Sequence, residues 1–299
     1  MTTTSSYRTQ YFDLPKIDSL EQFADSVHLS LRLLNQMVHR TAFYYYEFDI
    51  PKRAGGTRTI SSPSQSLKAV QAWILRRILD RSTIGSQATA FRRGRNLSFN
   101  VEPHLGNTHF LCMDFQDFFR SIGRDKIFTV FRTFGYNSSI SYALTNLCTY
   151  NGSLPQGAVT SPALSNIVCM RLDRRLVGFT SRRNIAYTRY SDDLAFSATN
   201  PSRLNGLVAW VERIARTEGF LINDGKTRYM GPGTQCRLTG IVLGKDRRGN
   251  DIYGVGRGKE RQLRTIIHAL LKTHPTDASY EAQLSRLKGW FSFLMDIDS

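Results

Sequence analysis

Three aspartates of this 299-residue chain stand where carboxylates are costly, inside or beside apolar segments. Asp192 and Asp193 are adjacent in the stretch RYSDDLAF, and Asp114 follows the apolar residues of THFLCMD. Because a buried charge needs a partner, these acids predict a turn, a cation or a metal ion that receives them. Strands of one sheet could bring all three within a few ångströms, and such a cluster suits Mg²⁺, which prefers oxygen ligands. The alternative is a solvated turn.

The chemistry that such a site offers is phosphoryl transfer. Two Mg²⁺ ions roughly 3.5–4 Å apart can activate a primer hydroxyl and stabilise the leaving pyrophosphate. Other metal ligands do not compete, because the six histidines form no ligand pair and the cysteines show no Cys-x-x-Cys spacing. We therefore predict buried, reduced thiols rather than zinc ligands or disulfides for the four cysteines. They are Cys112, Cys148, Cys169 and Cys236.

Short strands and helices must position these acids. The segments 185–190 and 194–198 predict two strands of a hairpin with the acids at its tip, and a buried strand is expected from about residue 108 to Asp114. Capping and apolar spacing predict helices at 18–40, from Ser62-Pro63, from Ser161-Pro162, at 204–217 and twice in the tail. Two further short strands are expected around Gly55-Gly56. This mixture predicts an α+β core with helix-rich ends.

The charge of the chain indicates a polyanionic partner. Forty Lys and Arg against 24 Asp and Glu give a formal charge of +16, which favours nucleic acid. An anionic membrane is the alternative, disfavoured because the cations are spread along the chain without a long basic amphipathic helix. No apolar run is long enough to span a bilayer, and the start MTTTSSYRTQ lacks a signal-peptide core. We expect a soluble, cytoplasmic protein.

Four segments resemble, in order, the palm motifs of reverse transcriptases. They are FLCMDFQDFFRSI, LPQGAVTSPALSN, YTRYSDDLAFSA and GFLINDGKTRYMGPGTQCRLTGIVLG. With the basic hairpin at 52–60 and AFRRGRN at 90–96, the resemblance covers roughly residues 50–245. It implies an RNA-directed DNA polymerase with two Mg²⁺ ions, shaped as a right hand with an antiparallel palm sheet. The implied domains are N-terminal helices and fingers at 1–105, with part of the fingers and palm in 124–155, the palm at 106–244, and an RNA-binding thumb at 245–299.

Two short stretches resemble retron reverse transcriptases in particular. NVEPH at 100–104 and LTG at 238–240 each differ by one residue from the Asn-Ala-x-x-His and Val-Thr-Gly stretches of that group, and Tyr-Ser-Asp-Asp replaces Tyr-Ala-Asp-Asp. The resemblance implies copying of the enzyme's own noncoding RNA, the msr-msd RNA, into a branched RNA–DNA product, msDNA, primed from a guanosine 2′-hydroxyl. It also implies a protein effector and a role in defence against phage.

The resemblance assigns roles to residues of the site. It makes Asp114, Asp192 and Asp193 the catalytic metal carboxylates, with the backbone carbonyl of Phe115 as a further ligand. It assigns binding of the incoming dNTP to Arg58, Phe119, Gln156 and Lys226. A guanidinium can grip phosphate oxygens bidentately, which favours Arg58 for the triphosphate. The ring of Phe119 is expected to exclude a ribose 2′-hydroxyl, whereas Phe118 is expected in the core. For Gln156, the alternative to a nucleotide-binding role is a place in an ordinary loop before a helix cap.

The remaining predicted contacts are with RNA. They involve Asn100, His104, Leu238, Thr239, Gly240, Arg257 and Lys259. The last two lie in the cation- and glycine-rich segment 245–264; the alternative to RNA binding by this segment is a flexible solvated loop. For Lys52 and Arg53 on the basic hairpin, the alternative is a solvated hairpin face. The alternative enzyme that the sequence allows is a group II intron-like or diversity-generating reverse transcriptase. Outside the enzymes, the alternative is an inactive RNA-binding scaffold, although such a protein would need no acids at these positions.

Overall fold

A computed structural model describes residues 13–51, 55–272 and 278–298. The chain divides into two compact units, each assembled from separate segments. The first unit comprises Met1–Gly85, Phe115–Arg174 and Arg213–Leu221, and the second comprises Ser86–Asp114, Arg175–Glu212 and Ile222–Ser299. Lys52 and Arg53, predicted on the basic hairpin, lie outside the described residues.

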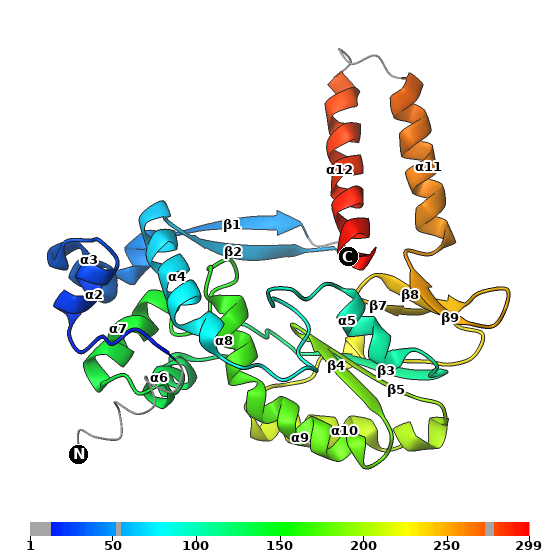
Figure 1. Ribbon diagram of the computed structural model, residues 1–299, viewed down its shortest axis with the longest axis horizontal. Helices are drawn as coiled ribbons and strands as arrows, with labels where there is room; N and C mark the ends of the chain where they lie inside the picture. Colours follow the sequence, from blue (N-terminus) through cyan, green and yellow to red (C-terminus); the bar gives the residue numbers. More distant parts are fainter. Residues whose placement is uncertain (1–12, 52–54, 273–277, 299) are drawn as a thin grey trace. The chain divides into compact units, whose positions relative to one another are not determined.

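The first unit is built of helices and one two-stranded hairpin (Figure 1). Strands β1 (Tyr45–Pro51) and β2 (Thr57–Pro63) pair antiparallel, with Pro51 opposite Thr57, which confirms the predicted hairpin. The other elements are α2 (Leu20–Ser26), α3 (Leu31–His39), α4 (Gln65–Arg77), α6 (Arg124–Thr133), α7 (Ser138–Cys148), α8 (Ser161–Val168) and the short 3₁₀ helices η1 (Thr41–Tyr44) and η2 (Leu79–Arg81).

The predicted single helix at 18–40 is wrong, because the chain forms two helices there. His28 between them has a φ of +55°, a left-handed conformation that ends a helix. Ser19 caps α2 by accepting a hydrogen bond from Gln22 N at 3.4 Å, so the predicted cap at Asp18 is off by one residue. Helix α3 has its own cap, Ser30.

Helix α4 also begins later than predicted. Ser62-Pro63 belongs to strand β2, where Pro63 lies opposite Tyr45, and the helix is capped by Ser64. The side chain of Ser64 accepts a hydrogen bond from Leu67 N at 3.4 Å. Strand pairing therefore extends β2 over the predicted cap, and the helix begins two residues later than expected. The predicted helix itself is confirmed.

The second unit contains a four-stranded antiparallel sheet with the order β4-β5-β3-β6 (Figure 1). Its strands are β3 (His109–Asp114), β4 (Ala186–Tyr190), β5 (Asp193–Ala198) and β6 (Arg228–Met230). The predicted buried strand ending at Asp114 is confirmed, and it lies centrally, between β5 and β6. Asp193, expected at the hairpin tip, is instead the first residue of β5.

An apolar cluster joins several further elements of the second unit to this sheet. The other described elements of the second unit are α5 (Ser98–Val101), η3 (Glu102–His104), η4 (Pro201–Leu204), η5 (Asp224–Lys226), β7 (Cys236–Leu238), β8 (Ile241–Lys245), β9 (Asp251–Gly254), α11 (Arg257–Lys272) and α12 (Ala278–Asp298). The cluster consists of Leu97, Val101, Phe110, Cys112, Ala195, Cys236, Leu238, Ile241, Val255 and Ile297. It therefore joins the four-stranded sheet, the sheet β7-β8-β9 and the last turn of α12.

Two helices, α9 (Met170–Ser181) and α10 (Leu207–Thr217), have residues in both units. The fold is the α+β class predicted from the sequence, and the two tail helices form a hairpin of neighbouring helices, α11 and α12 (Figure 1). All four cysteines are free and buried, as predicted. Among the described helices, none combines the length and the apolar character needed to cross a bilayer.

Candidate active site

Asp114 and Asp193 face each other at the end of the central strand pair. They are register partners, as are Cys112 and Ala195 two residues further into the sheet. Because side chains at i and i+2 share a face, the acids continue a row that begins in the apolar cluster. This face of the sheet thus changes from apolar to acidic at the strand ends. Like charges directly opposite each other are destabilising, so the pair favours binding of a cation.

A tight turn carries the third acid. Tyr190 and Asp193 are register partners, so Ser191 and Asp192 form a two-residue turn between β4 and β5. Ser191 has a φ of +60°, which is costly for a residue other than glycine. The fully buried Arg189 donates from Nη1 to the carbonyl oxygen of Ser191 at 3.1 Å. Arg189 therefore supports the turn that presents Asp192.

Lys226 neutralises Asp114 in this structure. Its Nζ atom lies 2.9 Å from both carboxylate oxygens of Asp114. The backbone of the same segment is attached to the strand, because Asn223 N donates to the carbonyl oxygen of Asp114 at 2.8 Å. The lysine is thus held at the acidic end of the sheet. Its predicted contact with the phosphates of the nucleotide stays a prediction, and it would require exchange of this ion pair.

The electrostatics of the acids reflect this crowding. Loss of surrounding water raises the pKa of Asp114, and the hydrogen bond from Lys226 opposes that rise. The pKa of Asp193 is raised to about 6, first by loss of water and then by the charges of Asp192 and Asp114, although its side chain retains an exposed part. The hydrogen bond to Asp114 raises the pKa of Lys226.

The acids fit a divalent ion that the substrate helps to hold. Among the described residues, no group of three or more His, Cys, Asp or Glu side chains is arranged to bind one ion. The charge of Asp192 acts on both Asp114 and Asp193, so the three acids lie near one another at the strand ends, and their binding of metal ions stays a prediction. Two facing carboxylates are sufficient for Mg²⁺, which is commonly held by one or two carboxylates plus substrate phosphates.

Aromatic rings anchor the chain directly after the first acid. Phe115 is buried, with its ring centroid 5.6 Å from that of Phe118 and 5.1 Å from that of Phe220. Phe118 is buried, which confirms its predicted place in the core. Phe119 is half-buried and meets only the edge of this cluster, with its centroid 5.3 Å from Phe118. Its role in sugar selection, and that of the Phe115 carbonyl as a ligand, stay predictions.

A glycine brings the predicted nucleotide-binding loop against strand β2. The carbonyl oxygen of Gln156 accepts a hydrogen bond from Ser61 N at 2.9 Å. Gly157 has a φ of +128°, and a Cβ atom there would lie 2.9 Å from both Ile60 Cγ2 and the carbonyl oxygen of Ser61. Arg58, exposed on the same strand, belongs to the same unit. The structure thus connects the loop with the strand that carries Arg58.

A buried glutamine fixes the other side of this loop. Gln71 is fully buried on the apolar face of α4. Its Nε2 donates to Tyr45 OH at 2.9 Å and to the carbonyl oxygen of Leu147 at 2.8 Å, and its Oε1 accepts from Val159 N at 3.2 Å. The sequence motifs do not predict a role for this residue. Its signal was a polar side chain at a position where helical spacing predicts an apolar one.

The two retron-like stretches contact each other. Asn100 donates from Nδ2 to Thr239 Oγ1 at 3.3 Å and accepts from Thr89 Oγ1 at 3.1 Å. The backbone N of Thr89 in turn donates to the carbonyl oxygen of Arg189 at 2.9 Å. Asn100 therefore links the β7–β8 turn to the strand that supports the acidic turn. Thr239 has a φ of +47°, unusual for a β-branched residue, so this turn is strained.

His104 connects the two strands of the acidic hairpin. Its ring nitrogens lie 2.6 Å from Ser197 Oγ and 2.8 Å from Thr188 Oγ1. Burial lowers the pKa of His104 to about 3, so the ring is neutral. Asn100, His104 and Leu238 are all buried, so they hold neighbouring segments in place, and their contact with RNA stays a prediction.

We expect Asn100→Ala to lower the free energy of unfolding by about 1–3 kcal/mol, because it removes the partner of the half-buried Thr239 hydroxyl and one of the two acceptors of the buried Thr89 hydroxyl. Chemical denaturation of the single and double variants with Thr239→Ala should show coupling of about 0.5 kcal/mol or more. Asn205→Ala, at an exposed asparagine of the same unit, is the matched control and should change little. Strict additivity would contradict the link.

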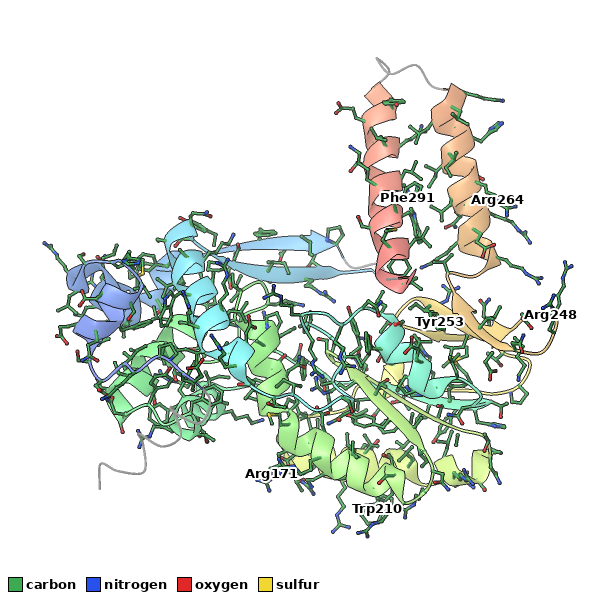
Figure 2. All side chains as sticks on the ribbon, in the orientation of Figure 1. Arg171, Trp210, Arg248, Tyr253, Arg264 and Phe291 are labelled. Atoms are coloured by element: carbon green, nitrogen blue, oxygen red, sulfur yellow. The ribbon has the colours of Figure 1, made fainter. Side chains whose placement is uncertain are left out.

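The tail residues have different environments. Lys259 is half-buried, and its Nζ lies 4.8 Å from the ring centre of Trp290 and 5.2 Å from that of Phe293. It therefore joins α11 to α12 by cation–π contacts. Arg257 is exposed at the start of α11. In Figure 2, Arg248 extends from the loop between β8 and β9, and contact of these cations with phosphate stays a prediction.

Comparison with known proteins identifies the family. Residues 50–243 match the family "Reverse transcriptase (RNA-dependent DNA polymerase)". The chain is 33% identical to the Retron Ec86 reverse transcriptase of Escherichia coli over 99% of this chain and 89% of that protein. It is 34% identical to the Retron Mx162 reverse transcriptase of Myxococcus xanthus, over 94% of this chain and 64% of that protein. The Retron Mx65 reverse transcriptase of the same organism is 31% identical, over 95% of this chain and 70% of that protein.

The chain therefore belongs to the reverse transcriptase family, and it is an RNA-directed DNA polymerase with the α+β fold of that class. Within the family it belongs with the retron reverse transcriptases, since the similarity extends over nearly its whole length. Its substrates are an RNA template and nucleotides, and enzymes of this family use divalent metal ions.

Proposed function

We propose that this enzyme copies part of its own structured noncoding RNA, the msr-msd RNA, into msDNA. Synthesis would start from the 2′-hydroxyl of a guanosine within that RNA, so that RNA and DNA remain joined by a branch. The observation that carries the proposal is similarity to retron reverse transcriptases over 99% of the chain, which includes the segments outside the polymerase motifs. The hydrogen bond between Asn100 and Thr239 supports it, because it joins the two retron-like stretches.

In the proposed reaction the priming oxygen attacks the α-phosphorus of a dNTP, and pyrophosphate leaves. Asp114, Asp192 and Asp193, with the carbonyl of Phe115, would hold two Mg²⁺ ions. When bound, the ions favour ionisation of the attacking hydroxyl and neutralise charge on the leaving group. Lys226, positioned beside Asp114, would balance the negative charge of the acids and the phosphates.

The residues of the first unit would bind the nucleotide. Arg58 would hold the triphosphate through its guanidinium fork, and Gln156 would contact the nucleotide from the loop fixed by Gly157 and Gln71. The polymerase domains are proposed at the boundaries expected from the sequence, with fingers in 1–105 and part of 124–155, palm in 106–244 and thumb in 245–299. A role in phage defence with a protein effector belongs to the same proposal.

Expression together with the neighbouring noncoding gene tests this function. We expect DNA joined to RNA by a 2′,5′ linkage, which debranching enzyme separates into two strands. A variant with both Asp192 and Asp193 changed to Asn serves as the control and should yield RNA alone. Recovery of only linear cDNA, extended from an ordinary 3′ end, would overturn the retron priming and favour a group II intron-like or diversity-generating enzyme.

We expect Phe119→Ala to increase incorporation of ribonucleotides relative to deoxyribonucleotides by about tenfold or more, because removal of a ring opens space for a 2′-hydroxyl. Selectivity is measured from kcat/KM for each nucleotide on a primed template. Phe119→Tyr keeps the ring and should keep the selectivity. An active Phe119→Ala enzyme with unchanged selectivity would assign this half-buried ring to packing against Phe118.

A further inference from the structure

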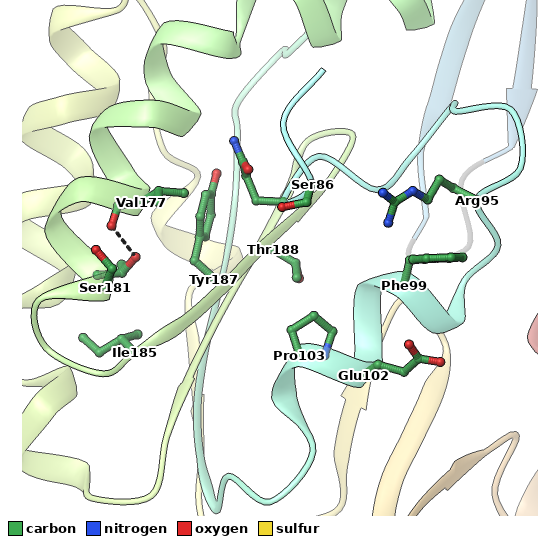
Figure 3. Close-up of a pocket in the computed structure, with 12 residues that line it drawn as sticks. Ser86, Arg95, Phe99, Glu102, Pro103, Val177, Ser181, Ile185, Tyr187 and Thr188 are labelled. Atoms are coloured by element: carbon green, nitrogen blue, oxygen red, sulfur yellow. Dashed lines mark hydrogen bonds between the residues drawn. The ribbon is translucent and has the colours of Figure 1, made fainter. Parts of the chain in front are cut away.

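A pocket with a volume of about 340 Å³ opens in the second unit beside the first retron-like stretch (Figure 3). Its volume lies at the lower end of the range for small-molecule sites, so it has room for one nucleotide but not for a duplex. It lies between η3, the segment at residues 86–99 and the end of α9. None of its lining residues is one of the acids or nucleotide-binding residues described above, although Thr188 is also a hydrogen-bond partner of His104.

A stacked cation forms one side of the pocket. The guanidinium carbon of Arg95 lies 4.2 Å from the ring centre of Phe99, and Figure 3 shows both side chains on the same side of the pocket. A guanidinium held flat on a ring presents its N–H groups in one plane, the geometry that binds phosphate bidentately. Within the described part of the chain, the guanidinium of Arg95 has no hydrogen bond or ion pair with another residue.

A fixed aromatic ring forms the opposite side. Tyr187 stacks on Phe196 with ring centroids 5.0 Å apart and an interplanar angle of 17°, so its position is set by the core of the sheet. Ile185 adds apolar surface on the side of Tyr187, and Pro103 adds apolar surface beside Glu102 (Figure 3). Unpaired bases of RNA bind to walls of this kind, because every base has an apolar face that can stack on a ring.

A carboxylate supplies the polar group that a sugar requires. Glu102 lines the pocket and is held in place by Tyr253, whose hydroxyl donates to Oε1 at 3.1 Å. The carboxylate accepts hydrogen bonds and donates none, so it suits a ribose hydroxyl and repels phosphate. A phosphate would therefore bind at Arg95, and a 2′-hydroxyl, the group that distinguishes RNA from DNA, at Glu102.

We propose that this pocket binds one unpaired ribonucleotide of the enzyme's RNA partner, with its phosphate at Arg95, its base against Tyr187 and its 2′-hydroxyl donating to Glu102. The inference rests on the proposed function, in which the enzyme binds a folded noncoding RNA. It adds a single-nucleotide contact that can discriminate between RNAs, which phosphate contacts alone do not. A free nucleoside monophosphate has the same chemistry and is the other source of such a ligand.

Ultraviolet cross-linking of the complex purified with its coexpressed noncoding RNA tests the site. After nuclease digestion, mass spectrometry should find a nucleotide attached to Phe99 or Tyr187. Arg95→Ala should weaken binding of that RNA by about 5- to 100-fold, the usual effect of losing one stacked or bidentate nucleotide contact. Arg93→Ala, which removes an exposed arginine from the same segment outside the pocket, is the matched control and should have a much smaller effect.

Two further measurements separate the possible outcomes. Extension of oligo(dT) on poly(rA) reports the polymerase itself and should be the same for wild type and Arg95→Ala. If the RNA bound by wild type is not the neighbouring noncoding transcript, the proposed function fails. If it is that transcript but the two arginine variants bind it equally, the pocket inference fails. Binding of AMP or GMP to RNA-free protein that Arg95→Ala removes, without any cross-link in the complex, would overturn the assignment to RNA.

Discussion

Replacing Asp192 and Asp193 together with asparagine is expected to abolish DNA synthesis, with turnover reduced by about 10³-fold or more. The amides keep the shape of the side chains but lose the charges that would hold divalent ions, and those ions contribute several kcal/mol to phosphoryl transfer. Primer extension on a defined RNA template measures the loss. Binding of RNA, measured by gel shift, should remain close to that of the wild type.

The structure adds a second readout that separates this effect from misfolding. Asp193 directly faces Asp114, and removal of a like charge at such a position should raise the free energy of unfolding by up to about 1 kcal/mol in EDTA. Asp25→Asn, at an exposed aspartate of the first unit, is the control and should leave synthesis intact. A double variant that folds, binds RNA and still extends primers would contradict the assignment of the acids.

The sequence could predict much of this site because strand alternation carries the information. The apolar residues before Asp114 and after Asp193 require buried strands, and an antiparallel hairpin brings the acids to one edge of the sheet. The alternation of apolar and polar residues could not show which acid lies in the turn. The pairing of Tyr190 with Asp193 decides this, because it places Asp193 in strand β5 and Asp192 in the turn. For that reason Asp193 was expected at the hairpin tip, whereas it begins strand β5.

The supporting residues were harder to predict because their partners are distant in sequence. Arg189 lies in an apolar strand and Gln71 on an apolar helix face, where a polar side chain signals only that a partner must exist. One partner of Gln71 is the backbone of Val159, 88 residues away. Likewise, the resemblance to retron enzymes implies that Asn100 and His104 bind RNA, whereas their burial depends on contacts with Thr239 and Ser197 that only the fold creates.

We expect Gly157→Ala to lower kcat/KM for the incoming dNTP by about 100-fold, because an added Cβ would displace the loop that carries Gln156. That atom would lie 2.9 Å from Ile60 Cγ2 and from the carbonyl oxygen of Ser61, and backbone cannot yield as a flexible side chain does. The φ of +128° adds strain for any residue with a Cβ atom. Single-nucleotide incorporation kinetics on a fixed primer and RNA template measure the effect.

A second glycine of the first unit separates crowding from backbone strain. Gly152 has a φ of +80°, but a Cβ atom there would meet nothing within 4 Å. Gly152→Ala should therefore cost stability through strain alone, about 1 kcal/mol, and leave kcat/KM for the dNTP nearly unchanged. Ile60→Ala should not rescue Gly157→Ala, because the carbonyl oxygen of Ser61 still occupies the space. Equal losses of kcat/KM in the two glycine variants would show that general destabilisation, rather than the position of Gln156, limits the enzyme.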